Sequence, residues 1–279
     1  MSYKSILVHL DTSKAVHSRL DLALSLATQF EAHLTGFFTV FTPEPGSFYV
    51  MAGNAEFYVE QRQRRAEQQG ALERLFRAEL LRAKVQGDWQ SSAEYANEVV
   101  PQAARIADLA IVGQYNRDDP DSFVAEQFIE STVLSAGRPV LVVPYAGQFD
   151  AIPSHVMIAW DGSREATRAL HDALPFLTRA KRVTVLTINA MRTDPAASRI
   201  PGTDIAAIVS RYGANVAIEE VEGVKGEPIG EMLLSRAADL GVDLIVMGCY
   251  GHSRWRELVL GGATRSILKS MTVPVLMSH

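Results

Sequence analysis

The stretch Ser5-Ile-Leu-Val-His-Leu-Asp11 lies near the start of the sequence, and Val156-Met-Ile-Ala-Trp-Asp161 resembles it at an offset of 150 residues. Each is a short apolar run that ends in an aspartate and a turn, as a buried parallel strand does. The segment after each run has apolar residues spaced by three and four positions, which places them on one helical face. These stripes repeat at the same offset: Val16, Leu20, Ala23, Leu24 and Ala27; then Ala166, Leu170, Ala173, Leu174 and Leu177.

The ends of the two copies match at a different offset, 135 residues. Asp108-Leu-Ala-Ile-Val-Gly113 corresponds to Asp243-Leu-Ile-Val-Met-Gly248, and Arg138-Pro-Val-Leu-Val-Val143 to Val273-Pro-Val-Leu-Met-Ser278. The difference, 150 − 135 = 15 residues, is extra chain inside the first copy, which we place in residues 42–65. Ordered matches at two fixed offsets indicate a duplication.

Each copy therefore reads as β-α-β-(loop and helix)-β-α-β-α-β, and alternating strands and helices predict a parallel, doubly wound sheet. We expect an α/β protein of two tandem domains, each a mostly parallel five-stranded sheet flanked by helices. The domains are predicted at residues 1–147 and 153–279. The third strands are expected near 85–93 and 216–221, and further helices near 59–84, 96–107, 205–212, 228–240 and 265–270.

Composition excludes several classes of protein. The net charge of −5, without a block of like charge, argues against a protein that binds nucleic acid through clustered Lys and Arg. Cys249 is the only cysteine, so no disulfide can form within the chain. No apolar stretch approaches the roughly 20 residues of a membrane span, and the N-terminus has no signal-peptide pattern. We expect a cytoplasmic protein that does not act at a membrane.

The second copy carries a glycine-rich segment after its fourth strand. Gly248 and Gly251 let the backbone approach a ligand closely, and Gly261 and Gly262 precede a predicted helix whose free N–H groups favour an anion. Such a site also lies where open α/β sheets bind ligands, at the carboxyl ends of the strands. The alternative is that these glycines only make turns and a tight helix–sheet contact. The segment is neither a Walker P-loop nor a dinucleotide fingerprint.

The spacing G-x2-G-x9-G, followed by small and hydroxyl residues, resembles the ATP-binding universal stress protein family. The strand end Ala159-Trp160-Asp161 and the final Val-Pro-Val-Leu strand are similar too. The resemblance implies an adenine-nucleotide α-hydrolase-like fold that binds ATP, or AMP or ADP, with or without Mg²⁺. Asp161 would contact ribose or adenine with Ala159 and Trp160 nearby, and Ile188 would pack on adenine. Ribose and phosphates would be surrounded by Met247, Gly248, Gly251, Gly261, Gly262, Ala263 and Thr264.

The resemblance also implies how the copies pair. One-domain family members dimerise through the last strand, so the two copies are expected to form an intramolecular pseudo-dimer, which leaves room for a further homodimer. One departure is Gly262, where the family usually has Ser or Thr. In the first copy only Gly113 of the glycines remains, and Asp118, Asp119, Asp121 and Glu126 would repel an anion. We expect that copy to be structural or to bind a different ligand.

Three functions stay open on these residues. The favoured one is a nucleotide-binding stress or regulatory protein without committed chemistry and without catalytic residues. The second is a slow ATPase or adenylating enzyme, for which Asp161 and Glu257 are the nearby carboxylates. The third is a scaffold that binds no nucleotide. Cys249 is interpreted as an inert thiol and His9 as a satisfied strand histidine.

Overall fold

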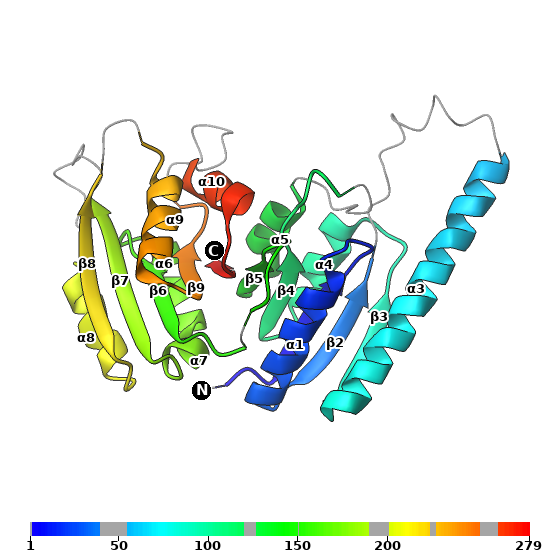
Figure 1. Ribbon diagram of the computed structural model, residues 1–279, viewed down its shortest axis with the longest axis horizontal. Coiled ribbons are helices and arrows are strands. Elements are labelled where there is room, and N and C mark those ends of the chain that lie inside the picture. The colour runs from blue at the N-terminus through cyan, green and yellow to red at the C-terminus, as the bar shows by residue number, and fades with distance from the viewer. Residues whose placement is uncertain are drawn as a thin grey trace.

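The computed structural model describes residues 2–39, 55–119, 127–149, 151–189, 201–223, 227–251 and 262–279. Ten strands form one sheet in the order β3-β2-β1-β4-β5-β10-β9-β6-β7-β8 (Figure 1). Within each half the paired strands are parallel, whereas β5 and β10 pair antiparallel where the halves meet. The predicted class, two doubly wound α/β halves in tandem, is confirmed.

The first half follows the predicted order of elements. It comprises β1 (Ser5–Leu10), α1 (Val16–Phe30), β2 (His33–Phe38), α3 (Ala55–Ala83), β3 (Gly87–Ser91), α4 (Ala96–Ala104), β4 (Leu109–Gly113), α5 (Phe128–Ala136) and β5 (Val140–Val143). The connection from β2 to β3 holds a helix of 29 residues, whereas its counterpart in the second half has nine. That difference is consistent with extra chain in this part of the first copy; residues 42–54 of the expected insertion lie outside the described ranges.

The second half repeats the order with one addition. It comprises β6 (His155–Ala159), α6 (Arg164–Asp172), α7 (Leu174–Leu177), β7 (Arg182–Asn189), α8 (Gly202–Ser210), β8 (Val216–Glu222), α9 (Ile229–Leu240), β9 (Leu244–Gly248), α10 (Gly262–Ser270) and β10 (Val275–Ser278). The apolar stripe from Ala166 to Leu177 predicted a single helix, which is wrong. The helix is interrupted at Ala173 because Pro175 has no N–H to donate and restricts the residue before it.

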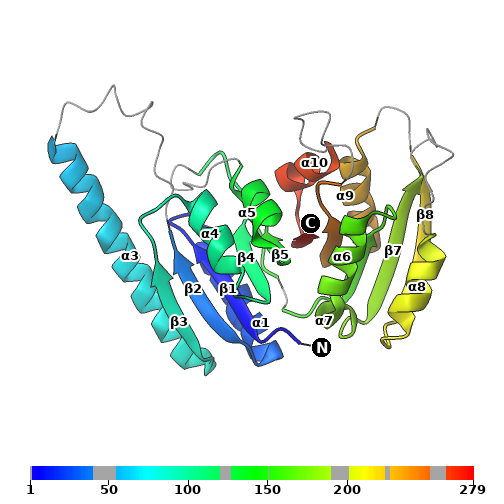
Figure 2. The same cartoon turned by 180° about the vertical axis from the view of Figure 1, so that it is seen from behind.

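The sheet is covered on both faces, as a parallel sheet of apolar strands must be. Buried side chains of α1, α3, α6, α7 and α8 pack on one face, and those of α4, α5, α9 and α10 on the other. Both clusters run across the two halves. The view from behind shows the same layered arrangement on either side of the β5–β10 junction (Figure 2). Among the described residues, no helix is both long and apolar enough to cross a membrane.

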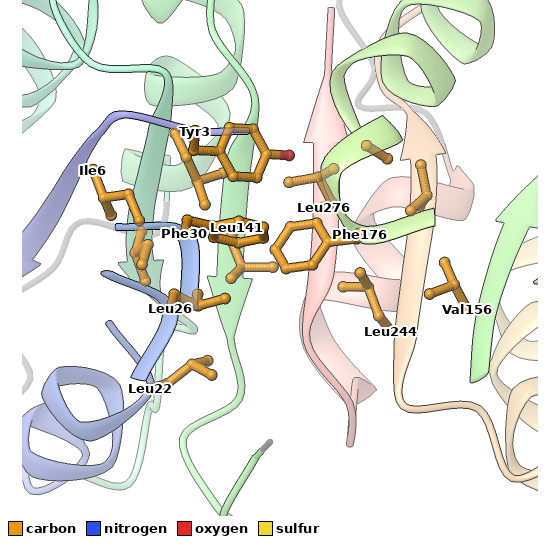
Figure 3. Packing of buried hydrophobic residues seen from close by; sticks show 14 of the residues in the cluster. Tyr3, Ile6, Leu22, Leu26, Phe30, Leu141, Val156, Phe176, Leu244 and Leu276 are labelled. Carbon is orange, nitrogen blue, oxygen red and sulfur yellow. The ribbon is translucent and has the colours of Figure 1, made fainter. Parts of the chain in front are cut away.

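Aromatic residues join the two halves beside this junction. Tyr3 and Phe30 of the first half meet Phe176 of the second, with ring centroids 5.1–5.6 Å apart (Figure 3). The Tyr3 hydroxyl donates a hydrogen bond to the carbonyl of Asp172 at 2.6 Å, and burial raises the pKa of Tyr3 well above its usual value. In the β5–β10 pair Leu141 lies opposite Leu276. The buried clusters on both faces of the sheet are therefore continuous between the halves.

Candidate functional site

Three neighbouring strands bring the predicted residues of the second half to one edge of the sheet. Ala159, at the end of β6, lies opposite Met247 on β9 and opposite Leu186 on β7. Ile188 follows two positions later on β7 and therefore points to the same face as Leu186. Ala159, Met247 and Ile188 all pack on the cluster beneath α9 and α10. The carboxyl ends of β6, β7 and β9 thus form one apolar floor.

The glycines after β9 have different surroundings, so the two readings of the segment can be separated. A Cβ on Gly248 would lie 2.3 Å from the backbone N of Ala166 on α6, so this glycine permits close helix–sheet packing. A Cβ on Gly251 would meet only the Glu165 carboxylate, and one on Gly262 would meet nothing within 4 Å among the described atoms. Packing explains Gly248 but does not explain Gly251 or Gly262.

The backbone between these glycines is held in an unusual conformation. Tyr250 has φ of +66° and is buried, whereas its counterpart Tyr115 is not among the described residues with positive φ. A left-handed backbone at a bulky residue is a rare conformation that costs on the order of 1–3 kcal/mol and is found most often at functional sites. The other described non-glycine residues with positive φ, Glu31 and Lys84, follow helix C-termini of the first half, so at this sheet edge the left-handed backbone is found in the second half.

The aspartate after β6 is exposed and held in place by the turn that starts α6. The backbone N–H of Ser163 donates to Oδ1 of Asp161 at 2.9 Å. The Ser163 hydroxyl in turn accepts from the N–H of Ala166 and caps α6. This turn presents the Asp161 carboxylate at the edge. Trp160 instead lies in the core, 3 % exposed, so its side chain supports the edge from below.

Helix α10 begins earlier than predicted. It starts at Gly262 rather than Arg265, so Gly262, Ala263 and Thr264 form its first turn, where N–H groups have no partner within the helix. Thr264 is buried, while Ala263 is half-buried. Gly230 on α9 lets the two helices approach, because a Cβ there would lie 2.6 Å from the Ala263 carbonyl. Gly261 and Glu257 lie outside the described residues.

The first half also helps to hold α10. The amide Nε2 of Gln114, just after β4, donates to the carbonyl of Leu268 in the last turn of α10 at 2.9 Å. Its Oε1 accepts from the N–H of Tyr145 at 3.2 Å, so Gln114 is fixed at both ends of its amide. Buried Cys249, directly after β9, is held by the C-terminal residues. Its backbone N–H donates to the carbonyl of Ser278, and its carbonyl is 3.0 Å from Nδ1 of His279.

The equivalent edge of the first half is filled by a buried ion pair. Arg19 of α1 donates to Oδ1 of Asp11 at 2.7 Å, and both side chains are at most 3 % exposed. Ser13 donates its hydroxyl to the same oxygen at 2.6 Å. Burial alone would raise the pKa of Asp11, but Arg19, His9 and the Ser13 hydrogen bond outweigh it and lower the pKa. Asp11 therefore stays ionised inside the protein.

His9 lies beside this pair and stays neutral. Burial, opposed by Asp11 and reinforced by Arg19, lowers the pKa of His9 to about 4. Its Nε2 is 3.1 Å from the Thr39 carbonyl, and its ring packs against Phe128 with centroids 4.9 Å apart. Its Nδ1 has no hydrogen-bond partner among the described residues. The interpretation of His9 as a strand histidine holds, although only one of its nitrogens is satisfied.

The two halves differ at three aligned positions around the edge. His9, Arg19 and Phe128 of the first half correspond, at the offsets of 150 and 135, to Ala159, Ala169 and Ala263 of the second. The three large side chains are at most 2 % exposed. Ala159 and Ala263 are half-buried and carry only a methyl group, whereas at Ala169 the backbone of α6 packs closer, as the surroundings of Gly248 show.

Sequence reasoning missed three residues of these sites. Arg19 stands at the helix position where the second copy has Ala169, so the alignment carried a signal. Glu165, in the first turn of α6, is buried beside Gly251, and no pattern in the sequence distinguishes it from an exposed acid that favours a helix N-terminus. The left-handed Tyr250 is a property of the backbone that only the structure shows.

The fold is that of an open, doubly wound α/β sheet, a class in which ligands are generally bound at the carboxyl ends of the strands. Residues 154–279 match the model of the universal stress protein family. The universal stress protein Slr1230 of Synechocystis sp. is 30% identical over 153 residues, which cover 53% of this chain and 49% of that protein. The chain thus spans about half the length of that relative.

Solved structures show the same fold over the whole chain. A universal stress protein from Archaeoglobus fulgidus DSM 4304 superposes with a TM-score of 0.72 at 15% identity, covering 98% of this chain and 95% of that one. A putative universal stress protein from Pseudomonas aeruginosa UCBPP-PA14 gives a TM-score of 0.61 at 15% identity, covering 99% and 93%. The C-terminal half thus matches the universal stress protein family, and the chain as a whole has the fold of universal stress proteins.

Proposed function

We propose that the second half binds an adenine nucleotide (ATP, ADP or AMP) and that the protein acts as a nucleotide-binding stress or regulatory protein. The observation that carries this proposal is the contrast at the aligned positions. His9 and Phe128 fill the edge of the first half, while the half-buried Ala159 and Ala263 place no large side chain at the aligned positions of the second. Gly262, where an added Cβ would meet no described atom within 4 Å, begins the helix at this place.

The described residues give the nucleotide plausible partners. The apolar floor of Ala159, Ile188 and Met247 suits a flat base. The exposed carboxylate of Asp161 suits ribose hydroxyls, which donate hydrogen bonds to a carboxylate. The unpaired N–H groups at the start of α10 suit a phosphate. Backbone at Gly248, Gly251, Gly261 and Gly262, with Ala263 and Thr264, would line the phosphate side, and Trp160 would support the floor.

We infer that the first half is structural with respect to nucleotide. Arg19, Asp11, His9 and Phe128 occupy the equivalent edge. We take residues 1–147 and 153–279 as the two domains, and we propose that the antiparallel β5–β10 pair makes them an intramolecular pseudo-dimer. Gln114 then gives the first domain a role in holding α10 of the second.

The proposal is tested by placing a residue of the first half's edge at the aligned position of the second half. Ala263→Phe places the first half's Phe128 at the start of α10 and is expected to weaken ATP binding about tenfold or more, a loss of at least about 1.4 kcal/mol. Isothermal titration calorimetry measures it. The matched control, Ala238→Phe, adds the same ring at an exposed position of α9 and should leave affinity unchanged.

Two further results would decide between the functions. Gly251→Asp adds a side chain and a negative charge beside Glu165 and should abolish binding; equal heats for this variant and the wild type would contradict the site. ATP that stays intact for hours with Mg²⁺ on the purified protein supports a binding protein. Rapid release of ADP that Asp161→Ala abolishes would show an ATPase instead.

A further inference from the structure

A buried carboxylate lies behind the proposed phosphate side of the site. Glu165, in the first turn of α6, is 3 % exposed. Its Oε1 accepts from the largely exposed Arg164 at 3.0 Å, but Oε2 has no hydrogen-bond partner among the described residues. A buried carboxylate oxygen without a partner is costly, because buried charges are ordinarily paired or coordinate metals. A ligand that pairs with Oε2 of Glu165 would remove this cost.

The position of Oε2 shows where that ligand would lie. A Cβ on Gly251 would be 3.2 Å from Oε2 and 3.8 Å from the carboxyl carbon, and no other described atom is within 4 Å. The carboxylate thus faces the backbone of Gly251. The positive end of the α6 dipole stabilises the charge of the Glu165 carboxylate in part. The helix dipole does not explain burial, however, since the first-turn acids Glu98 and Glu231 of α4 and α9 are exposed.

We propose that Oε2 of Glu165 is a ligand of the divalent cation, Mg²⁺, that accompanies the nucleotide in the second half; this inference rests on the proposed function. A bare carboxylate would repel a phosphate bound at Gly251. A cation between the two turns the repulsion into attraction. Mg²⁺ is typically held by one or two carboxylates together with phosphate oxygens and water.

The competing explanation is that Oε2 only accepts a backbone N–H and positions the glycine segment. Glu165→Gln separates the two, because glutamine keeps an acceptor oxygen and the same length but loses the charge that holds a cation. Glu231→Gln is the matched control, since it makes the same change at an exposed acid in the first turn of α9.

The experiment is a calorimetric titration of ATP in Mg²⁺ and in EDTA, with thermal melting of each variant as a check on folding. In the wild type and in Glu231→Gln, Mg²⁺ should raise ATP affinity about tenfold or more, equivalent to at least about 1.4 kcal/mol. In Glu165→Gln most of that gain should disappear, while the affinity in EDTA stays equal or rises. Mn²⁺ titrated into the ATP-loaded protein, followed by electron paramagnetic resonance, should bind more weakly to Glu165→Gln.

The outcomes separate this inference from the proposed function. A wild type that binds ATP equally well in Mg²⁺ and in EDTA overturns the cation site without any variant. A Glu165→Gln protein that is folded and keeps the full Mg²⁺ gain overturns it as well. In both cases the nucleotide site stands. Absence of ATP binding to the wild type in both solutions overturns the cation site, and absence of ADP and AMP binding as well overturns the proposed function.

Discussion

Asp11 and Asp161 occupy the same position in the two halves, at the end of a central strand, yet they meet opposite environments. Asp11 is buried and paired with Arg19. Asp161 is exposed, and among the described residues its carboxylate accepts a hydrogen bond only from the backbone N–H of Ser163 in the adjoining turn. At the aligned helix position the first half has Arg19 and the second has Ala169, and His9 and Phe128 of the first half are likewise alanines in the second. Two copies of one fold can therefore keep the same order of strands and helices while large buried side chains occupy the carboxyl edge of the sheet in only one of them.

The glycine that ends the fourth strand of each half is the second part of this comparison. A Cβ on Gly113 would lie 1.8 Å from Nη1 of Arg19, and one on Gly248 would lie 2.3 Å from the α6 backbone. Both glycines make room, but for different neighbours. The same residue thus permits a buried guanidinium in one half and a closer helix in the other.

The largest expected effect comes from breaking the buried ion pair. Arg19→Ala leaves the Asp11 carboxylate buried without its charge partner, and we expect a loss of about 3–5 kcal/mol in the free energy of unfolding. Chemical denaturation measures this loss. The control is Arg168→Ala, which removes a half-exposed arginine that pairs with Asp172 and should cost at most about 1 kcal/mol. Equal losses would contradict the comparison.

The next effect separates Gly248, a glycine required for packing, from Gly262, a glycine of the proposed ligand site. Gly248→Ala forces its Cβ against backbone atoms of α6, which cannot move without shifting the helix, so we expect a loss of about 3 kcal/mol. Gly262→Ala adds a methyl group where the described structure is open and should leave stability within about 0.5 kcal/mol. Thermal and urea denaturation of both variants test this. A destabilised Gly262→Ala would place that glycine in the core.

A pH dependence is expected from His9, a residue whose counterpart is Ala159. Because burial lowers the pKa of His9 to about 4 in the folded protein, the unfolded chain takes up the proton first as the pH falls. Stability is then lost between about pH 6.5 and 4, by about 2 kcal/mol between pH 7 and 4.5. His9→Gln should lack this part of the loss; unfolding measured across that range decides it. Parallel curves would show that His9 does not titrate there.

The smallest effect concerns the contact between the halves. Tyr3→Phe keeps the ring against Phe30 and Phe176 but removes the hydrogen bond to the Asp172 carbonyl, at a cost of about 1 kcal/mol. A single unfolding transition should remain, because the two halves share their core. Two separate transitions in the calorimetric scan of the variant would show that this hydrogen bond joins halves that are otherwise independent.

The repeat offsets and apolar periodicity were sufficient to predict the order of elements and the parallel sheet. Strand and helix bounds followed closely where the pattern was strong, as at β4 and α9. The prediction failed at Ala173, where Pro175 divides a stripe that looked continuous, and at α10, which starts three residues early. Glycine is a poor helix former, so a helix that begins at Gly262 has no signal in local propensity.

The candidate site was predicted only as a set of positions. The family resemblance assigned Ala159, Ile188, Met247 and Gly251 to one site, and the topology agrees because parallel strands end at one edge of the sheet. It could not tell which glycine serves packing, since that depends on the distance between β9 and α6. Nor could it show that Glu165 is buried, because its neighbours come from β9, far away in the chain.

The sequence by itself determined the duplication, the α/β class and the loss of the glycine pattern from the first copy, because these depend on periodicity and residue type. The tertiary structure decided what occupies the corresponding edge of the first half: Arg19 and Asp11 form a buried ion pair there, with His9 and Phe128 beside them. It also decided the antiparallel meeting of β5 and β10. Charge pairing, burial and backbone strain depend on residues distant in sequence and close in space, and no local pattern specifies them.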